Sequence, residues 1–503
     1  MIPILASDLM HDRHGTNRRR FLTWSAQAAA MACVGMVGGC EGGGGRGPGG
    51  PAAEGPRPAE AAPRPGRFYV PADPRYTIFD SAADSLRFTL TRCMTTYRGH
   101  ACATSSFVDP EGRIMDWHDF GPLEGPGWAA NAVGGAYELI RWARLTGSAE
   151  MERTALSVLD HVLEDGFIDR GTGLIRGYRH VPRGEIVLNF KHTSDWFCPG
   201  SAAKVGVQML LCSDLDPGRC DALRAAAKGY ADWLDAHVKV LPNGWFPRRC
   251  TAAGAPYEAS AEGGKDPFFA TSADGLFILQ LWAELAARRL GDYRERLGRG
   301  LAAFRAAGGF YASINHDTYD ANENVACSVA FRVFRRAGQV LDDPAPGRYG
   351  LQEILPRLDR FKMGEDRNGV ATTGLLWMEA TWDTSYMWEN AEASLAYLEA
   401  YTDTRRRAYL DDALTILRAS ARHHHGPHGF LTEGVDWNNH VGEKHHIGGA
   451  KFGPIQYTEP FLNNQHVVEP TWYFLREHAG LSRDGDATVY RDHENNVVAR
   501  LKT

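Results

Sequence analysis

The sequence has no excess of basic residues. Its 55 lysines and arginines are outnumbered by 61 aspartates and glutamates, which gives a formal charge of −6 and a pI near 6.3. Nucleic-acid binders usually carry a basic stripe, so this balance argues against that class. The chain also lacks a Walker loop and a G-x-G-x-x-G segment after a strand-like run. Nucleotide-dependent chemistry is therefore not expected either.

Cysteine is scarce and irregularly spaced. The nine cysteines include no C-x-x-C pair, and two of them, Cys33 and Cys40, lie in an N-terminal segment apart from the body. Cys212 and Cys220 flank a short loop and are a candidate disulfide. The body holds seven cysteines, an odd number, so at least one stays free. We expect no disulfide framework, no metal and no other cofactor.

Long apolar runs are absent apart from one near the N-terminus. Residues 24–37 form a mainly apolar run without an acid, and a motif with two arginines precedes it: Arg18, Arg19, Phe21 and Leu22. The run is too short to span a bilayer comfortably. The arginine pair resembles a twin-arginine export signal, and Cys40 ends a box that resembles a lipoprotein signal-peptidase site. An ordinary secretory signal with a chance cysteine is the alternative.

These features divide the chain into three parts. Residues 1–40 are expected to be the export signal, with Cys40 as the lipid-attachment residue. Residues 41–66 are rich in Gly and Pro and have too little apolar surface to offset their ordering entropy, so they predict a flexible tether. Residues 67–503 are expected to form one catalytic domain. The mature protein is then an exported lipoprotein, periplasmic or at the cell surface, held on a membrane.

The body alternates helical patterns with loops of two lengths. Apolar residues recur at helical spacing, and the expected helices span residues 85–97, 129–145, 150–164, 200–212, 221–240, 272–290, 292–307, 324–341, 350–361, 384–401, 405–423 and 466–478. Short connections within pairs predict antiparallel hairpins, and long connections between pairs place the long loops at one end.

This alternation predicts an all-α (α/α)6 toroid of about twelve helices. The last helix pairs with the first, six helices lie inside and six outside, the long loops share one face, and little β-structure is expected. An open α-solenoid is the alternative. Such arrays repeat at a fixed period of roughly 34–47 residues with short loops, whereas the hairpins here are longer and uneven.

The inner helices are expected to begin with the same kind of cluster, which combines an acid, an aromatic ring and amide side chains. Flat rings beside carboxylates and amides suit sugars, because rings stack on C–H faces while polar groups bond hydroxyls. Helix capping and core packing are the competing roles. The predicted substrate-binding residues are Glu124, Trp128, Asn131, His192, Trp196, Tyr386, Trp388, Glu433, Asp436, His440, Glu459 and His466.

Three acids at these helix starts are predicted to be catalytic: Asp195, Asp383 and Glu389. Glycoside cleavage needs one protonated and one ionised carboxyl across the scissile bond. Asp195 begins another inner helix. It is therefore the best candidate to face Asp383 or Glu389 across the substrate cavity at the end of the ring that carries the long loops. A lyase is also consistent with the sequence, because its proton-abstracting base can be a His or Tyr, and the chain offers His192, His440, Tyr257 and Tyr457.

With the six helix starts aligned, residues 80–480 resemble the six-hairpin glycosidase superfamily, including the segments 121–128 and 436–440. That superfamily contains glucuronidases, unsaturated glucuronyl hydrolases and sugar epimerases. The resemblance implies an (α/α)6 toroid and a glycoside hydrolase that acts on an oligo- or polysaccharide, with uronic acid as a candidate component. A polysaccharide lyase and a glycan-binding surface lipoprotein are the alternatives.

Overall fold

The computed structural model describes residues 76–104, 107–115, 122–128, 131–190, 195–261, 263–314, 318–379, 384–425, 428–438 and 452–502. The predicted signal, the tether and Cys40 lie outside the described residues. The chain divides into two compact units. The helical unit comprises residues 63–145 and 149–478, and the described part of the small unit comprises residues 146–148 and 479–502.

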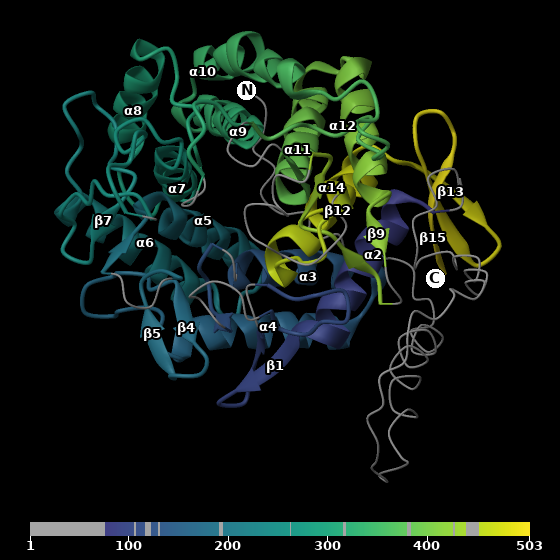
Figure 1. Cartoon of the computed structure of the whole chain (residues 1–503), viewed down its shortest axis with the longest axis horizontal. Helices are drawn as coiled ribbons and strands as arrows, with labels where there is room; N and C mark the ends of the chain where they lie inside the picture. Colours follow the sequence, from purple (N-terminus) through teal and green to yellow (C-terminus); the bar gives the residue numbers. More distant parts are fainter. Residues whose placement is uncertain are drawn as a thin grey trace, which may run out of the picture. The chain divides into compact units, whose positions relative to one another are not determined.

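Six helices line the inside of the helical unit, around the centre of Figure 1: α3 (Ala132–Thr146), α5 (Pro199–Leu215), α7 (Gly275–Ala287), α9 (Asn324–Leu341), α11 (Met387–Thr404) and α14 (Val468–Glu477). All of these except α14 are buried on almost every face. In α11, for example, every residue from Met387 to Leu398 is buried. This is the burial expected of a helix that is surrounded by other elements.

The outer helices are amphipathic instead: α2 (Ile78–Phe88), α4 (Ala149–Glu164), α6 (Cys220–His237), α8 (Arg294–Ala306), α10 (Pro344–Tyr349) and α12 (Arg407–Ala421). In α4 the buried side chains recur at helical spacing, and the intervening residues face solvent. The first helix, α2, packs against α12 and α14, so the two ends of the helical series meet and close the ring (Figure 1). The predicted (α/α)6 toroid is confirmed.

Two predicted helices differ from the structure. The helix expected over residues 85–97 begins earlier, at Ile78, and continues only as a π-turn (Thr89–Cys93) before strand β1 (Met94–Tyr97), which pairs with β2 (His100–Ala103). Arg98 and Gly99 between these strands both have positive φ, as a tight hairpin turn requires.

The helix expected over residues 350–361 is a second departure. It consists of a π-turn (Gly350–Ile354) and a 3-10 helix (Leu355–Phe361) that follow α10. Pro356 lies in this segment, and proline has no backbone N–H to donate within a regular α-helix.

Short strands hold the long loops together at one end of the ring. Strand β3 (Leu123–Glu124) pairs with β4 (Tyr178–His180), which pairs with β5 (Glu185–Val187). Strand β6 (Trp196–Phe197) pairs with β7 (Cys250–Thr251), and β9 (His424–His425) pairs with β10 (Phe430–Leu431). Strand β11 (Gly434–Asp436) lies between β8 (Thr384–Tyr386) and β12 (Gly453–Pro454). Because β3, β6 and β8 shortly precede inner helices, these pairings fix the starts of those helices.

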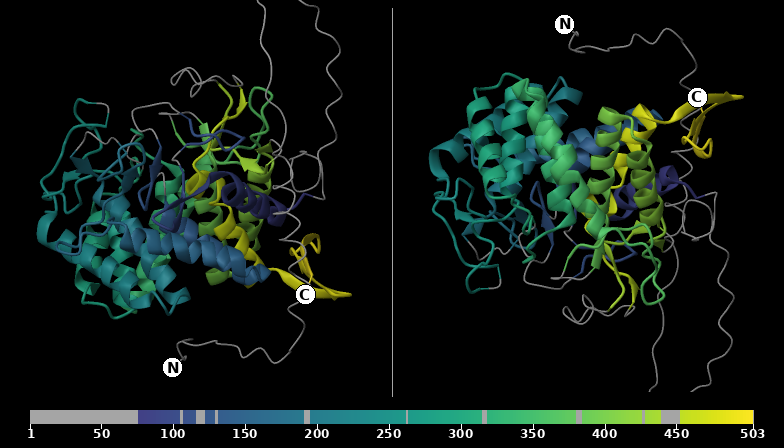
Figure 2. Two further views of the ribbon diagram at one scale, coloured as in Figure 1. Left: turned by 90° about the horizontal axis from the view of Figure 1, so that it is seen from below. Right: turned by 90° about the horizontal axis from the view of Figure 1, so that it is seen from above.

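The small unit is an antiparallel meander of three strands (Figure 2): β13 (Gly480–Asp484), β14 (Ala487–Arg491) and β15 (Val497–Lys502). Gly485, with φ of +60°, lies in the turn between the first two strands, a conformation that favours glycine. The sequence predicts one domain over residues 67–503, and its pattern does not indicate this sheet.

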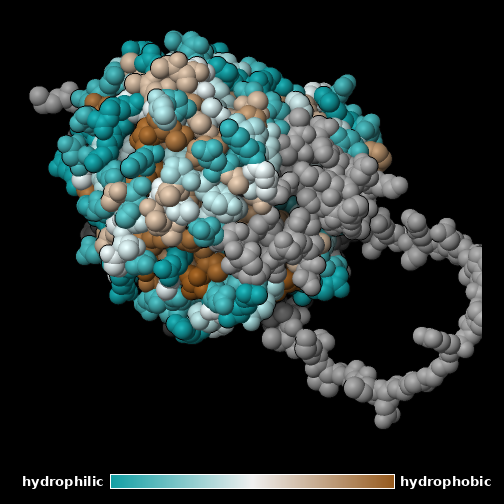
Figure 3. Space-filling model, turned by 60° about the vertical axis from the view of Figure 1, so that its left-hand side comes forward, coloured by the Kyte–Doolittle hydropathy of each residue, from teal (hydrophilic) through white to brown (hydrophobic). Residues whose placement is uncertain are grey.

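On the face of the helical unit drawn in Figure 3, hydrophobic residues form scattered patches among hydrophilic ones. Among the described residues, no helix combines the length and the apolar character that a membrane crossing requires.

Candidate functional site

Three aromatic rings meet where α3, α7 and α11 begin. Trp128 packs edge-on against Trp388, with ring centroids 5.2 Å apart, and in a tilted arrangement against Phe277, with ring centroids 5.6 Å apart. We call these three rings the aromatic layer. The ammonium of Lys204 lies 4.4 Å from the ring centroid of Trp128 and 5.3 Å from that of Trp388. The structure therefore brings together two predicted binding residues, and it adds a buried cation that the sequence analysis did not propose.

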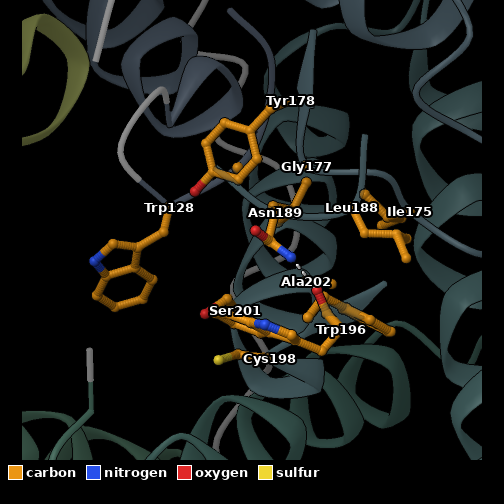
Figure 4. A pocket seen from close by; sticks show the side chains of 13 residues that line it. Trp128, Ile175, Gly177, Tyr178, Leu188, Asn189, Trp196, Cys198, Ser201 and Ala202 are labelled. Carbon is orange, nitrogen blue, oxygen red and sulfur yellow. Dashed lines mark hydrogen bonds between the residues drawn. The ribbon is translucent and has the colours of Figure 1, made fainter. Parts of the chain in front are cut away.

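Trp128 and Trp196 line one pocket beside this layer, with about 380 Å³ of space that is partly open to solvent. Figure 4 shows the two tryptophans on separate sides of the pocket, with Asn189 donating a hydrogen bond to the backbone carbonyl of Trp196. The indole N–H of Trp128 is buried and has no hydrogen-bond partner within the described residues. Aromatic walls with a few polar groups are typical of small-molecule sites.

Two buried carboxyls interact at the starts of α9 and α11. Glu323 is the N-cap residue of α9, and Glu389 lies in the first turn of α11; their exposures are 0% and 1%. Burial raises the pKa of Glu323 to about 8 and that of Glu389 well above its ordinary value, and the charge of Glu323 raises the pKa of Glu389 further. Two neighbouring carboxyl groups that are both buried do not ionise together, because their negative charges would repel each other without solvent screening. The pair therefore keeps at least one proton near neutral pH.

The two carboxyls differ in their hydrogen bonds. Glu323 accepts from the backbone N–H of Ile314 at 2.8 Å, and a hydrogen bond from Thr318 also lowers its pKa. Glu389 accepts from the side-chain amide of Asn324 at 2.8 Å. Hydrogen bonds to a carboxylate stabilise the charged form, so Glu323 is the one that ionises first and Glu389 the one that keeps its proton.

Asp274, directly before α7, is a third buried acid near the rim. It is 1% exposed, and no N–H or O–H donor reaches either carboxyl oxygen within the described residues. Burial raises its pKa to about 7, although Arg248 and Arg249 lower it. Those two arginines are themselves buried and ion-paired with Asp266. Asp274 therefore does not cap its helix, which is the role that aspartate usually has at such a position.

A charged chamber lies next to the aromatic layer, on the axis of the ring. All six inner helices contribute to its lining, and it holds about 520 Å³ of space that is partly open to solvent. Burial raises the pKa of Glu392, but Arg332 and His466 outweigh this and hold it below its ordinary range. Burial raises the pKa of Glu138 well above its usual value, and burial lowers the pKa of Lys204. The chamber thus contains an ionised and a protonated carboxyl.

His466, a predicted binding residue, bridges these two acids. Its Nε2 lies 3.1 Å from Glu392, and its Nδ1 lies 3.7 Å from Glu138. The residues just before His466 also connect the last inner helix to its neighbours. The side chain of Asn463 accepts from the backbone N–H of Trp388 at 3.2 Å, and the side chain of Gln465 donates to the backbone carbonyl of Gly135 at 2.8 Å. The structure thus places His466 in contacts that close the ring.

Several other predicted binding residues also have partners inside the protein. Both Nε and Nη2 of Arg179 donate to one oxygen of Glu124, at 2.8 and 2.6 Å. Asn131 donates to the carbonyl of Phe461 at 3.3 Å, and Glu459 accepts from Asn463. The carboxylate of Glu124 is therefore held in an ion pair rather than directed into either pocket.

The last long loop returns to the start of α11. Strand pairing sets Gly434 opposite Tyr386 and Asp436 opposite Thr384. Glu433, Asp436 and Tyr386 are 8%, 4% and 8% exposed. Of the predicted residues in this loop, Glu433 and Asp436 are thus brought next to the helix that carries Glu389.

Four predicted residues remain. Asp195 is exposed and makes no hydrogen bond or ion pair within the described residues. His192, Asp383 and His440 lie outside the described residues. Glu323 and Asp274 were not predicted as catalytic acids from the sequence, although both stand at the starts of predicted inner helices. The missing signal was their burial, which depends on the packing of distant segments.

Comparisons with known proteins bear on the fold. No protein-family model and no curated protein sequence match the chain. A cellobiose 2-epimerase from Bacillus thermoamylovorans B4167 superposes with a TM-score of 0.57 and 12% identity, over 78% of this chain and 98% of that one. A D-mannose isomerase gives 0.51 and 11%, over 79% and 97%. A family 76 glycoside hydrolase from a bovine Bacteroides thetaiotaomicron strain gives 0.50 and 12%, over 79% and 77%.

Identities this low carry information about the fold alone. These solved structures are (α/α)6 toroids of the six-hairpin glycosidase superfamily, and the chain shares that fold. The predicted resemblance to this superfamily is confirmed at the level of architecture.

Proposed function

We propose that this protein is a sugar-processing enzyme, and more closely a glycoside hydrolase acting on an oligo- or polysaccharide. The observation that carries the proposal is the buried pair of Glu323 and Glu389 at the starts of two inner helices. Carboxyls that oppose each other's ionisation supply one proton donor and one base, which is what glycoside cleavage requires.

In this proposal Glu389 protonates the departing glycosidic oxygen, and ionised Glu323 acts as the base or nucleophile. Trp128 and Trp196 supply flat rings for the C–H faces of sugar units. A uronic acid is a candidate component of the substrate, because the positive N-termini of the inner helices favour an anion. The fold supports a sugar substrate, since structures that share it include an epimerase, an isomerase and a hydrolase of carbohydrates.

Epimerisation or isomerisation of a free sugar is the second candidate. It is favoured by the epimerase and isomerase among the structures that share the fold. Isotopically labelled water separates the two reactions. Hydrolysis adds one water oxygen to the product and leaves its C–H bonds unlabelled, whereas proton-transfer epimerisation or isomerisation carries solvent deuterium onto carbon.

The first experiment screens purified protein against cellobiose, mannose, mannan oligosaccharides and disaccharides that contain glucuronic acid. New reducing ends carrying water oxygen support the hydrolase. Deuterated epimers or isomers support the second candidate, and a new ultraviolet chromophore from an unsaturated uronate supports a lyase. Binding without any product supports a glycan-binding protein and overturns the enzyme proposal.

Carboxylate-to-amide variants then test the site. Glu323→Gln and Glu389→Gln should each lower kcat by about 10²–10⁴-fold. Asp195→Asn and Asp383→Asn test the other two acids that were predicted from the sequence. Glu295→Gln is the matched control, since this carboxylate is 82% exposed on the outer helix α8. If both glutamate variants keep full turnover while Asp195→Asn or Asp383→Asn loses it, the catalytic pair is misassigned.

We also propose that the protein is exported and anchored in a membrane through Cys40. The sequence pattern of residues 1–40 supports this. Cells that express the full chain with radiolabelled palmitate should yield a labelled protein in the membrane fraction. Cys40→Ala should abolish the label, and Arg18→Lys combined with Arg19→Lys should block export. A labelled Cys40→Ala protein would refute the anchor.

A further inference from the structure

A cluster of Cys, Glu and His side chains, residue types that ligate zinc, lies among β2, β3 and the outer helix α4. The thiol of Cys102, the carboxylate of Glu124 and Nε2 of His161 lie within 4.8 Å of one another. All three residues are buried, with exposures of 1%, 1% and 0%. They come from three separate segments, and no short sequence motif joins them. We propose that Cys102, Glu124 and His161 bind one zinc ion, or a similar borderline divalent cation.

The ring of His161 is oriented for this role. Its Nδ1 hydrogen-bonds to Asp165 at 2.8 Å, and its Nε2 is buried without a hydrogen-bond partner within the described residues. Metal-ligating histidines commonly hold a carboxylate on the other ring nitrogen, which fixes the tautomer and directs the free nitrogen at the metal. The rings of Tyr97 and Phe167 pack edge-on against His161 and limit its rotation.

The donor set and its spacing fit zinc. Zinc takes Cys, His and Glu ligands in a tetrahedron, with bonds near 2.0–2.3 Å, so neighbouring nitrogen and oxygen ligands stand roughly 3.4 Å apart. Nε2 of His161 already lies 3.7 Å from Oε2 of Glu124. Three protein ligands leave the fourth position for water.

The surrounding charges also fit a divalent ion. A thiolate at Cys102 together with Glu124 and Asp165 carries three negative charges, which one zinc ion and Arg179 would neutralise. Arg179 donates to one oxygen of Glu124 and lies over the Tyr97 ring, with 3.7 Å from its Cζ to the ring centroid. Binding forms a bond from the metal to the sulfur and releases the thiol proton to solvent.

A second grouping of His100, His161 and Asp165 is the weaker candidate. Asp165 already hydrogen-bonds to both histidines, at 2.9 and 2.8 Å, so these donors satisfy one another without an ion. The set with Cys102 leaves the free nitrogen of His161 for the metal. Since Glu124 lies four residues before Trp128, the ion would also fix the loop that carries this tryptophan to the aromatic layer.

The test uses the full chain freed of metal with a chelator and then titrated with Co²⁺. We expect one cobalt ion per chain and a thiolate-to-cobalt charge-transfer band, which added Zn²⁺ removes by displacement. Zn²⁺ should also raise the thermal midpoint of the metal-free protein. Both effects should vanish in Cys102→Ser and in His161→Gln. Cys212→Ser, which alters a buried thiol on α5, should keep both.

Other outcomes overturn the proposal. A band that persists in Cys102→Ser belongs to another thiol, and cobalt bound without a thiolate band belongs to a site that does not include Cys102. If wild type shows neither a band nor a zinc-dependent midpoint, the cluster is only a hydrogen-bonded network. Circular dichroism of the metal-free variants identifies any that fail to fold, and Glu124→Gln then serves as a third variant, in which cobalt affinity should fall by about 10–100-fold or more.

Discussion

Replacing Glu323 by glutamine should stabilise the protein at pH 8 while it removes the proposed activity. The carboxyl is fully buried, and burial is the largest of the effects that raise its pKa from 4.5 to about 8. Glutamine has nearly the same shape and keeps an oxygen that can accept from the N–H of Ile314, which lies 2.8 Å from the carboxyl. It never ionises, so neither the folded nor the unfolded variant titrates there, and the pH-dependent cost of folding at this position disappears.

The sign follows from proton binding. Between pH 4.5 and 8 the folded protein keeps a proton on Glu323 that the unfolded chain has lost, so rising pH favours unfolding. One pH unit corresponds to at most about 1.4 kcal/mol, which sets an upper limit of about 5 kcal/mol over this interval. Polarisation of the surrounding protein lowers the free-energy cost of a buried charge below this limit. We therefore expect the variant to gain about 2–4 kcal/mol at pH 8.

Urea unfolding at pH 5 and pH 8, followed by far-ultraviolet circular dichroism, measures this difference. Wild type and Glu323→Gln should be about equally stable at pH 5, and the variant should be more stable at pH 8. Glu295→Gln should show no such pH-dependent gain, because its side chain is 82% exposed. If the glutamine variant gains nothing at pH 8, or gains the same amount at both pH values, the buried-acid reasoning is refuted.

Four further predictions concern two glycines, one buried ion pair and the dependence of activity on pH. A Cβ at position 135 would stand 2.2 Å from the ring of Phe461, so Gly135→Ala should lower the free energy of unfolding in urea by about 1–3 kcal/mol. Gly298→Ala on α8, where a Cβ meets nothing within 4 Å, should raise it by about 0.5–1 kcal/mol. Arg332→Met leaves Glu392 buried without its cation and should cost about 3–5 kcal/mol in the same assay. The kcat/KM of the proposed activity should rise about tenfold per pH unit up to about pH 8 and then level, because the base must lose its proton; an optimum near pH 5 would contradict this.

The sequence pattern predicted where the long loops lie, but not what their residues do. Their unequal lengths predicted that they share one end of a ring, and the strand pairs at that end agree with this. Residue type alone did not assign roles within the loops. Glu124 and His466 are residue types that often bind sugars. In the structure, however, the carboxylate of Glu124 pairs with Arg179, and the imidazole of His466 lies between Glu138 and Glu392.

The sequence by itself determined the ring, because apolar spacing within a helix and the length of a connection are local properties of the chain. It also selected Glu389, which follows Trp388 in the first turn of an inner helix. Only the tertiary structure decided which acids meet. Asn324, which hydrogen-bonds to Glu389, is 65 residues away along the chain. Burial and like-charge repulsion set the pKa of a carboxyl, and both exist only after those distant segments have packed together.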